Sequence, residues 1–203
     1  MSGGIEFMQS LLLRVKNIII HPRDEWRVIR EEPATYSAVI RYAAVLATLP
    51  PLAAVAGRFV FDGNIQANKV AFSLAFILLT NLLWYCMYIF NIAVAGAIIA
   101  AIVTTPASRL NGVQGLTIAA YSFTPLFIAG FVAVIPGMGW VLDVAVVYSL
   151  YLLYLGIIAL PAMGRGRALG YTVASFLSAA VIVGVMNLLE YYFESLIMNR
   201  LVS

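Results

Sequence analysis

Long apolar segments that are almost free of charged residues restrict what this chain can fold into. Hydrophobic residues make up 63% of the sequence, charged residues make up 10%, and the mean hydropathy is +0.97. A soluble domain carries about 25% charged residues, because its surface must be hydrated. Too few charges are present here to cover a water-soluble protein, so the sequence predicts an integral membrane protein.

Five apolar segments are long enough to cross a bilayer, since a helix needs about 20 residues to span the hydrocarbon core. They cover about residues 36–60, 70–103, 116–135, 140–160 and 169–189. We therefore predict an all-α polytopic protein with five transmembrane helices, preceded by short interfacial amphipathic helices. Its three regions would be a cytoplasmic or interfacial segment (1–34), a five-helix transmembrane domain (35–190) and a short C-terminal interfacial tail (191–203).

The N-terminal segment contains two amphipathic stretches. In residues 5–20, apolar residues recur every three or four positions opposite a polar stripe, which is typical of a helix lying among lipid headgroups. A helix packed on the protein's own cytoplasmic face would show the same pattern. A second helix should begin at Pro22 and end before Pro33. Trp26 lies opposite its arginines, and we interpret this residue as an anchor at the membrane interface.

Basic residues are distributed unevenly between the two ends of the predicted spans. With a cytoplasmic N-terminus, eight would lie inside and three outside: Arg14, Lys16, Arg23, Arg27, Arg30, Arg109, Arg165 and Arg167 against Arg58, Lys69 and Arg200. This bias predicts a cytoplasmic N-terminus and an external C-terminus. Because the basic residues flank spans and form no dense patch, a nucleic-acid partner is not expected.

Motifs for catalysis or metal binding are not found in the sequence. It has no GxSxG, HExxH, Walker or Rossmann pattern. Cys86 is the only cysteine and His21 the only histidine, so neither an intrachain disulfide nor a Cys/His metal site is expected. We therefore predict a protein that is not an enzyme and that binds no cofactor.

Polar residues inside the predicted spans are candidates for function, because such groups are costly in hydrocarbon. Arg41 lies near the inner end of the first span, where its long side chain can reach the headgroups. The other candidates could hydrogen-bond between helices or line a path for a solute: Asn81, Asn91, Asp143, Tyr148 and Tyr151. The middle of each span lacks an acidic residue, which disfavours a path for ions or protons.

Small residues recur at every fourth position in two spans. They are Ala93, Ala97 and Ala101 in the second span and Gly170, Ala174 and Ser178 in the fifth. This spacing allows two membrane helices to approach closely. We therefore predict helix–helix contacts along both stripes.

The third span contains the segment Ala120-Tyr121-Ser122-Phe123-Thr124-Pro125-Leu126. Pro125 cannot donate a hydrogen bond to the Tyr121 carbonyl four residues earlier, and Ser122 can hydrogen-bond locally. The segment therefore predicts a hinge within the span.

This segment is similar to the Gly-Tyr-Ser-x-x-Pro signature of the Yip family, five-span proteins named for binding Ypt/Rab GTPases, with Ala120 where glycine is usual. Residues 21–33, with Pro22, Trp26 and Ile29, resemble the family's Pro-x-x-x-Trp-x-x-Ile lead-in. The basic stretch 163–168 resembles the loop before its last span. The order of these features over nearly the whole chain resembles the small bacterial, YohC-like members.

The resemblance implies a five-span fold in a bacterial inner membrane and no established reaction. The chain lacks the Asp-Leu-Tyr-Gly-Pro motif of the eukaryotic members, which argues against a Rab-type GTPase as partner. We predict a non-enzymatic membrane scaffold or adaptor that organises the lipid bilayer or partner proteins, including further copies of itself. A small solute or ion transporter or channel is the alternative.

Overall fold

The computed structural model describes residues 2–61, 70–103, 110–160 and 165–202, and this part of the chain contains helices and no strands. The helices are α1 (Ser2–Ile20), α2 (Pro22–Glu31), α3 (Tyr36–Ala47), α4 (Leu49–Phe61), α5 (Val70–Ile102), α6 (Gly112–Ser122), α7 (Thr124–Val132), α8 (Trp140–Ala159) and α9 (Arg165–Val202). The all-α prediction is therefore confirmed.

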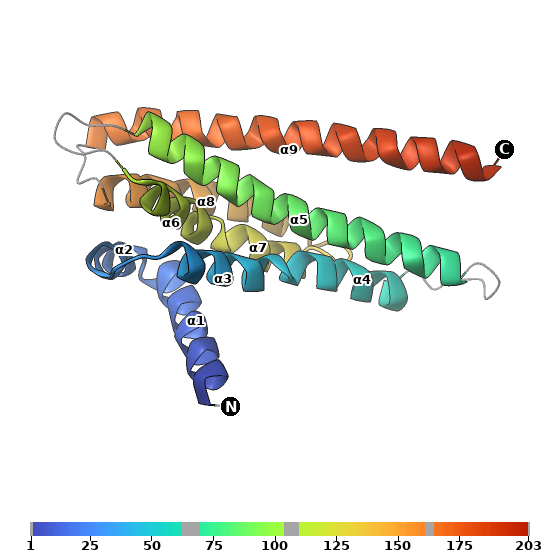
Figure 1. Ribbon diagram of the computed structural model, residues 1–203, viewed down its shortest axis with the longest axis horizontal. Coiled ribbons are helices and arrows are strands. Elements are labelled where there is room, and N and C mark those ends of the chain that lie inside the picture. The colour runs from blue at the N-terminus through green and yellow to red at the C-terminus, as the bar shows by residue number, and fades with distance from the viewer. Residues whose placement is uncertain (1, 62–69, 104–109, 161–164, 203) are drawn as a thin grey trace.

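Four segments of the described chain are long and apolar enough to cross a membrane. They are Tyr36–Gly57 (α3 and most of α4), Ile77–Ile102 (in α5), Gly112–Val132 (α6 and α7) and Trp140–Ala159 (α8). α9 is one continuous helix that packs beside α5 and α8 (Figure 1). No interruption separates the predicted fifth span from the predicted C-terminal tail.

Two of the spanning segments are interrupted close to prolines. The first is interrupted at Thr48, and Pro50 and Pro51 then lie in the first turn of α4. The third is interrupted at Phe123, and Pro125 lies in the first turn of α7. A proline is tolerated in the first turn of a helix because its missing N–H has no partner there in any case. Each spanning segment therefore continues as a second helix after the interruption.

The backbones of α5 and α6 approach each other closely at two glycines. A Cβ atom added at Gly96 would lie 2.7 Å from the Leu116 Cα, and one added at Gly115 would overlap the Gly96 carbonyl oxygen. Both glycines are therefore needed for the two backbones to approach this closely.

The predicted stripes of small residues do not make such contacts within the chain. Ala93, Ala97 and Ala101 are exposed on α5, and Gly170 and Ala174 are exposed on α9. The Ser178 hydroxyl donates to the carbonyl of Ala174 in its own helix. The prediction of helix contacts along these stripes is therefore wrong for this chain, because neighbouring faces of the same helices pack inward instead.

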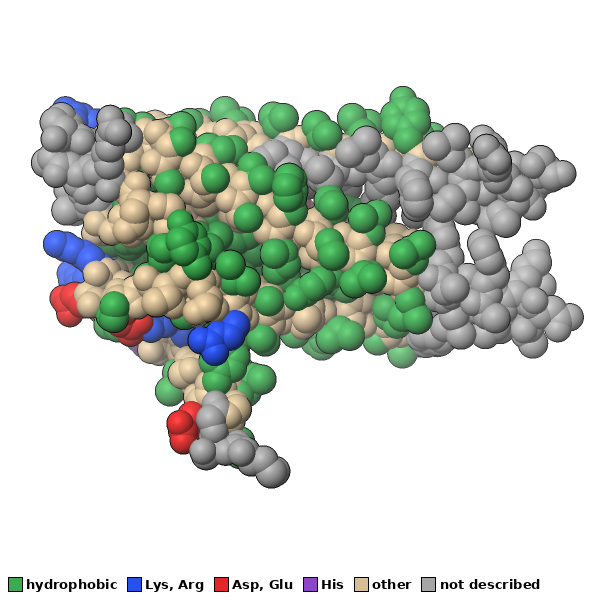
Figure 2. Space-filling model, viewed as in Figure 1, with side chains coloured by type: hydrophobic (Ala, Val, Ile, Leu, Met, Phe, Trp, Pro, Cys, Tyr) green, Lys and Arg blue, Asp and Glu red, His purple; other side chains and the backbone are tan. Residues whose placement is uncertain are grey.

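α1 lies crosswise to the long helices and extends away from the bundle (Figure 1). α2 folds back from it and packs against α8. On the face drawn in Figure 2, the described charged side chains lie along α1 and at the left end of the bundle, around α2 and at the start of α9, and hydrophobic side chains cover much of the rest. This arrangement places a charged end of the bundle next to an outlying helix.

Candidate functional site

Arg14 of α1 forms ion pairs with two glutamates. Its Nη1 donates to Glu25 Oε1 of α2 over 2.6 Å, and its Nη2 donates to Glu32 Oε2 over 2.5 Å. The side chains of Arg14 and Glu25 are only 17% and 8% exposed, whereas that of Glu32 is half exposed. Water screens an ion pair less when both partners are partly buried. The Arg14–Glu25 pair, which joins α1 to α2, is therefore screened less than a surface ion pair would be.

The Arg14 guanidinium keeps its charge in this environment. Burial is the largest single influence and lowers its pKa, but the hydrogen bond to Glu32 and the electrostatic interactions with Tyr121, Glu32 and Glu25 together raise the pKa above its ordinary value. An arginine is already protonated at all physiological pH values. We therefore treat Arg14 as a permanent cation.

Aromatic rings continue the contact from Arg14 into the bundle. The guanidinium carbon lies 5.8 Å from the centroid of the Tyr121 ring, which meets Trp26 and Tyr42 edge to face at centroid distances of 6.3 and 4.5 Å. The hydroxyl groups of Tyr42 and Thr124 are 2.8 Å apart and share a hydrogen bond. We call these seven residues the Arg14 cluster: Arg14, Glu25, Trp26, Glu32, Tyr42, Tyr121 and Thr124.

Trp26 lies in the protein core and does not anchor the chain in lipid. It is 1% exposed, and its ring is so close to α8 that a Cβ added at Gly156 would lie 2.8 Å from it. Its Nε1 atom has no hydrogen-bond partner among the described residues. The prediction of an interfacial anchor is therefore wrong. Because α2 packs against α8, the side of α2 opposite its arginines is covered by protein.

One side of α1 docks on the bundle. Leu11 and Ile18 are buried, and the Tyr148 hydroxyl donates to the Ile19 carbonyl over 2.6 Å. That carbonyl lies in the last turn of α1, where carbonyls lack a partner within the helix. The Arg41 guanidinium lies 5.6 Å from the centroid of the Phe7 ring. Tyr148 and Arg41 therefore contribute to the docking of α1.

Another side of α1 remains uncovered. Ile5, Met8 and Leu12 are 61%, 45% and 59% exposed and follow one another at helical spacing. Leu13 and Ile20 are exposed as well. One face of the helix therefore packs on protein, as one of the two sequence interpretations expected, and a second apolar face is left free.

Comparison with known proteins identifies the family. A family model described as the Yip1 domain matches residues 16–187. This chain belongs to the Yip1-domain family. The match includes all four candidate spans, and the chain is an integral membrane protein.

Two relatives of this Yip1-domain protein are both named inner membrane protein YohC. The inner membrane protein YohC of Escherichia coli strain K12 is 28% identical over 180 residues, which cover 86% of this chain and 89% of YohC. YohC of Escherichia coli O6:H1 matches with the same identity and coverage. No solved structure gives a significant match. The two segments that resemble the Yip signatures meet in the Arg14 cluster of this Yip1-domain protein, where Trp26 contacts Tyr121.

The hinge residues lie at the interruption of the third span. Ser122 is fully buried, and its hydroxyl has no partner among the described residues. Pro125 is buried at the start of α7. The interruption lies where the sequence predicts it, and the functional role of these residues stays a prediction.

The remaining candidates do not converge on one site. The Asn81 side chain donates to the Ile77 carbonyl of its own helix over 2.8 Å, and its role between helices stays a prediction. Asn91 is partly buried on α5, and Tyr151 lies beside Tyr148 with ring centroids 5.8 Å apart. Asp143 is exposed in the first turn of α8, where the helix dipole favours a carboxylate.

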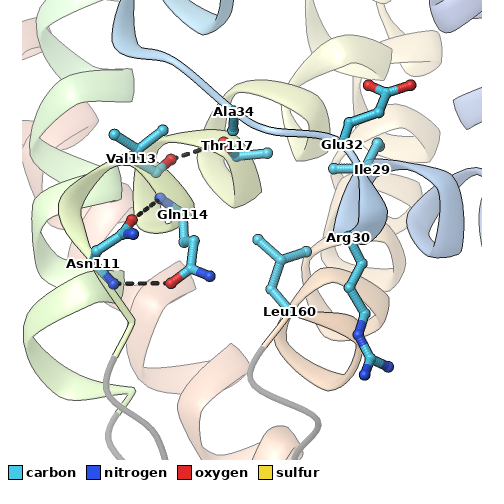
Figure 3. A pocket seen from close by; sticks show the side chains of 9 residues that line it. All are labelled: Ile29, Arg30, Glu32, Ala34, Asn111, Val113, Gln114, Thr117 and Leu160. Atoms are coloured by element: carbon cyan, nitrogen blue, oxygen red, sulfur yellow. Dashed lines mark hydrogen bonds between the residues drawn. The ribbon is translucent and has the colours of Figure 1, made fainter.

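A small pocket lies at the charged end of the bundle, between α2, α6 and the end of α8 (Figure 3). Asn111 and Gln114 close a capping box at the start of α6 beside it. The volume of the pocket is about 160 Å³, below the roughly 300 Å³ of the smallest usual ligand pockets. It is lined by Ile29, Arg30, Glu32, Ala34, Asn111, Val113, Gln114, Thr117 and Leu160, and includes none of the residues singled out from the sequence as candidates.

Sequence reasoning missed five members of the Arg14 cluster: Arg14, Glu25, Glu32, Tyr42 and Thr124. The available signal was Arg14 itself, a cation inside the first amphipathic stretch, with two glutamates 11 and 18 residues further along. In the part of the chain that the structure describes, no three His, Cys, Asp or Glu residues group as metal ligands would.

Proposed function

We propose that this protein is a non-enzymatic scaffold of the bacterial inner membrane that organises lipid or partner proteins. The observation that carries the proposal is the free apolar face of α1, formed by Ile5, Met8 and Leu12 outside the bundle. Full burial of a large apolar side chain gains roughly 1.5–3 kcal/mol, and burial among headgroups gains less. Because α1 is crosswise to the spans, this face lies along the membrane surface when the bundle crosses the bilayer.

The same proposal includes a fifth span and an orientation. Residues 169–189 of α9 are apolar and pack alongside α5 and α8, which supports a fifth crossing. Arg14, Arg27 and Arg30 belong to the part of the molecule where α1 and α2 meet the bundle. The excess of basic residues at this end favours a cytoplasmic N-terminus and, with five crossings, an external C-terminus.

This orientation is tested by introducing single cysteines into the protein and labelling them in intact cells. With Cys86→Ser as background, we expect a membrane-impermeant thiol reagent to label Asn64→Cys and Val202→Cys and to leave Gly3→Cys unlabelled. Permeabilised cells serve as the control, since all three positions should then react. Labelling of Gly3→Cys alone in intact cells would reverse the orientation, and labelling of Asn64→Cys without Val202→Cys would contradict an odd number of crossings.

The lipid contact of α1 is tested with the full-length protein in nanodiscs of neutral phosphatidylcholine. Nitroxide labels at Met8→Cys and Leu12→Cys should collide with oxygen dissolved in lipid and be shielded from a water-soluble nickel chelate. Ser10 is the matched control, because a spacing of 100° per residue places it on the opposite side of α1. Equal exposure of all three labels to the nickel chelate would show that α1 stays in water and would overturn the scaffold proposal.

Local satisfaction of polar groups supports a scaffold over the transporter alternative. Asn81 donates within its own helix, and Tyr148 donates to α1. Each of these donors therefore has a partner inside the protein, on α5 and on α1, and the two bonds do not point into one path. Flux of ions and small solutes into proteoliposomes separates the two functions: a scaffold should give the leak of empty liposomes, and saturable flux would favour a transporter.

A further inference from the structure

We propose that the position of α1 and the bend of the third span are coupled through Arg14, so that the membrane surface controls the angle between α6 and α7. The inference rests on the proposed lipid contact of α1. It assigns to the Arg14 cluster the role of a mechanical link between a helix on the membrane surface and a break inside the membrane. Arg14 and Tyr121 act in it as positioning residues.

The first step of the link is the rigidity of α1. Leu12 belongs to the free apolar face, and Arg14 lies only two residues further along the same helix. Within a continuous helix these two side chains move together. Any tilt or rotation that buries Leu12 in lipid therefore shifts the Arg14 guanidinium relative to Glu25 and Tyr121.

The second step is the contact across the interruption. Tyr121 is the second-last residue of α6, and Thr124 is the first residue of α7. Tyr42 of α3 touches both, through its ring at Tyr121 and its hydroxyl at Thr124. A displacement of the Tyr121 ring therefore changes the contacts that set the angle between α6 and α7.

The third step is that the angle between α6 and α7 can change easily at this interruption. Pro125 removes one backbone donor from the break, so bending there requires no hydrogen bond from this residue to be broken. The Ser122 hydroxyl is buried without a partner among the described residues, and a changed angle could give it one. Helical hydrogen bonds persist on either side, from Phe123 N–H to Ala119 and from Phe127 N–H to Phe123. These features favour a hinge between two stiff helices.

The coupling is tested by measuring two distances, each between a pair of spin labels, in the same protein. With Cys86→Ser as background, full-length protein in phosphatidylcholine nanodiscs carries spin labels either at Met8 and Ile40 or at Phe131 and Leu169, all exposed positions. The first pair reports the docking of α1, and the second reports the position of α7 relative to the start of α9. Arg14→Gln is compared with Lys16→Gln, which removes the same charge from an exposed neighbour on α1.

We expect Arg14→Gln to shift or broaden both distance distributions by more than about 2 Å, the size of typical helix shifts in coupled proteins, and Lys16→Gln to change neither. Tyr121→Leu removes the aromatic ring that Arg14 contacts. It should also shift or broaden the distance distributions of both label pairs. If Arg14→Gln releases α1 while the distance from 131 to 169 stays constant in both variants, the coupling is wrong. Failure of the oxygen-collision experiment at Leu12 would instead overturn the proposed function, and the two failures are thus distinguishable.

Discussion

Replacing Trp26 by alanine is expected to lower the free energy of unfolding by about 3–5 kcal/mol, the usual cost of removing a buried tryptophan or phenylalanine ring. Trp26 is 1% exposed and fills the space between Tyr121 of α6 and Gly156 of α8. Its loss leaves a cavity and removes the edge-to-face contact with Tyr121, which adds about 0.5–1.5 kcal/mol beyond burial. The measurement is reversible unfolding in mixed micelles, followed by helix content.

Trp140 provides a matched control for this substitution. It is 60% exposed at the start of α8, so Trp140→Ala should change stability far less. Trp26→Phe should recover part of the loss, because it restores most of the ring volume without a buried N–H that lacks a partner among the described residues. Equal stability of Trp26→Ala and Trp140→Ala would show that Trp26 is not part of the core.

Four of the five predicted spans, and the interruption of the third, could be recognised in the sequence because their causes are local. Hydropathy over about 20 residues marks a span, and a proline marks the place where a helix can be interrupted. The predicted boundaries of 70–103 and 140–160 agree closely with α5 and α8. Pro125 likewise identifies the break at Phe123.

The environment of Trp26 could not be predicted from its neighbours in the sequence. A tryptophan on the apolar side of a short basic helix has the same local pattern whether lipid or protein covers it. Only the packing of α2 against α8 distinguishes the two. The ion pairs of Arg14 depend in the same way on how α1 and α2 fold back on each other.

The sequence also could not predict how α5 is rotated about its own axis, that is, which of its faces packs against the other helices. Its faces are apolar all round, because lipid and protein interior are both apolar environments. Ala93, Ala97 and Ala101 therefore resemble a contact stripe as much as the face that is in fact used. Gly96, which does make the close contact, is distinguished only by its partner Gly115 on α6.

That contact gives the second large expected effect: Gly115→Ala should destabilise the protein towards the upper part of the range of about 1–3 kcal/mol that overpacking usually costs. The added Cβ would overlap the Gly96 carbonyl oxygen and lie 2.8 Å from the Ala100 Cβ. A carbonyl in the middle of a helix cannot move aside as the end of a flexible side chain can. The helices α5 and α6 must therefore separate, and neighbouring side chains lose packing contacts.

Gly170→Ala is the control for Gly115→Ala, because nothing lies within 4 Å of a Cβ added at Gly170 on α9. Alanine favours a helix over glycine by about 1 kcal/mol, so this control should leave stability unchanged or raise it. The same intrinsic preference acts at Gly115 and opposes the clash, so the difference between the two variants measures the close approach of α5 and α6. Unfolding in mixed micelles provides the comparison. Equal or higher stability of Gly115→Ala relative to Gly170→Ala would mean that the two helices cross at a wider separation than the structure has.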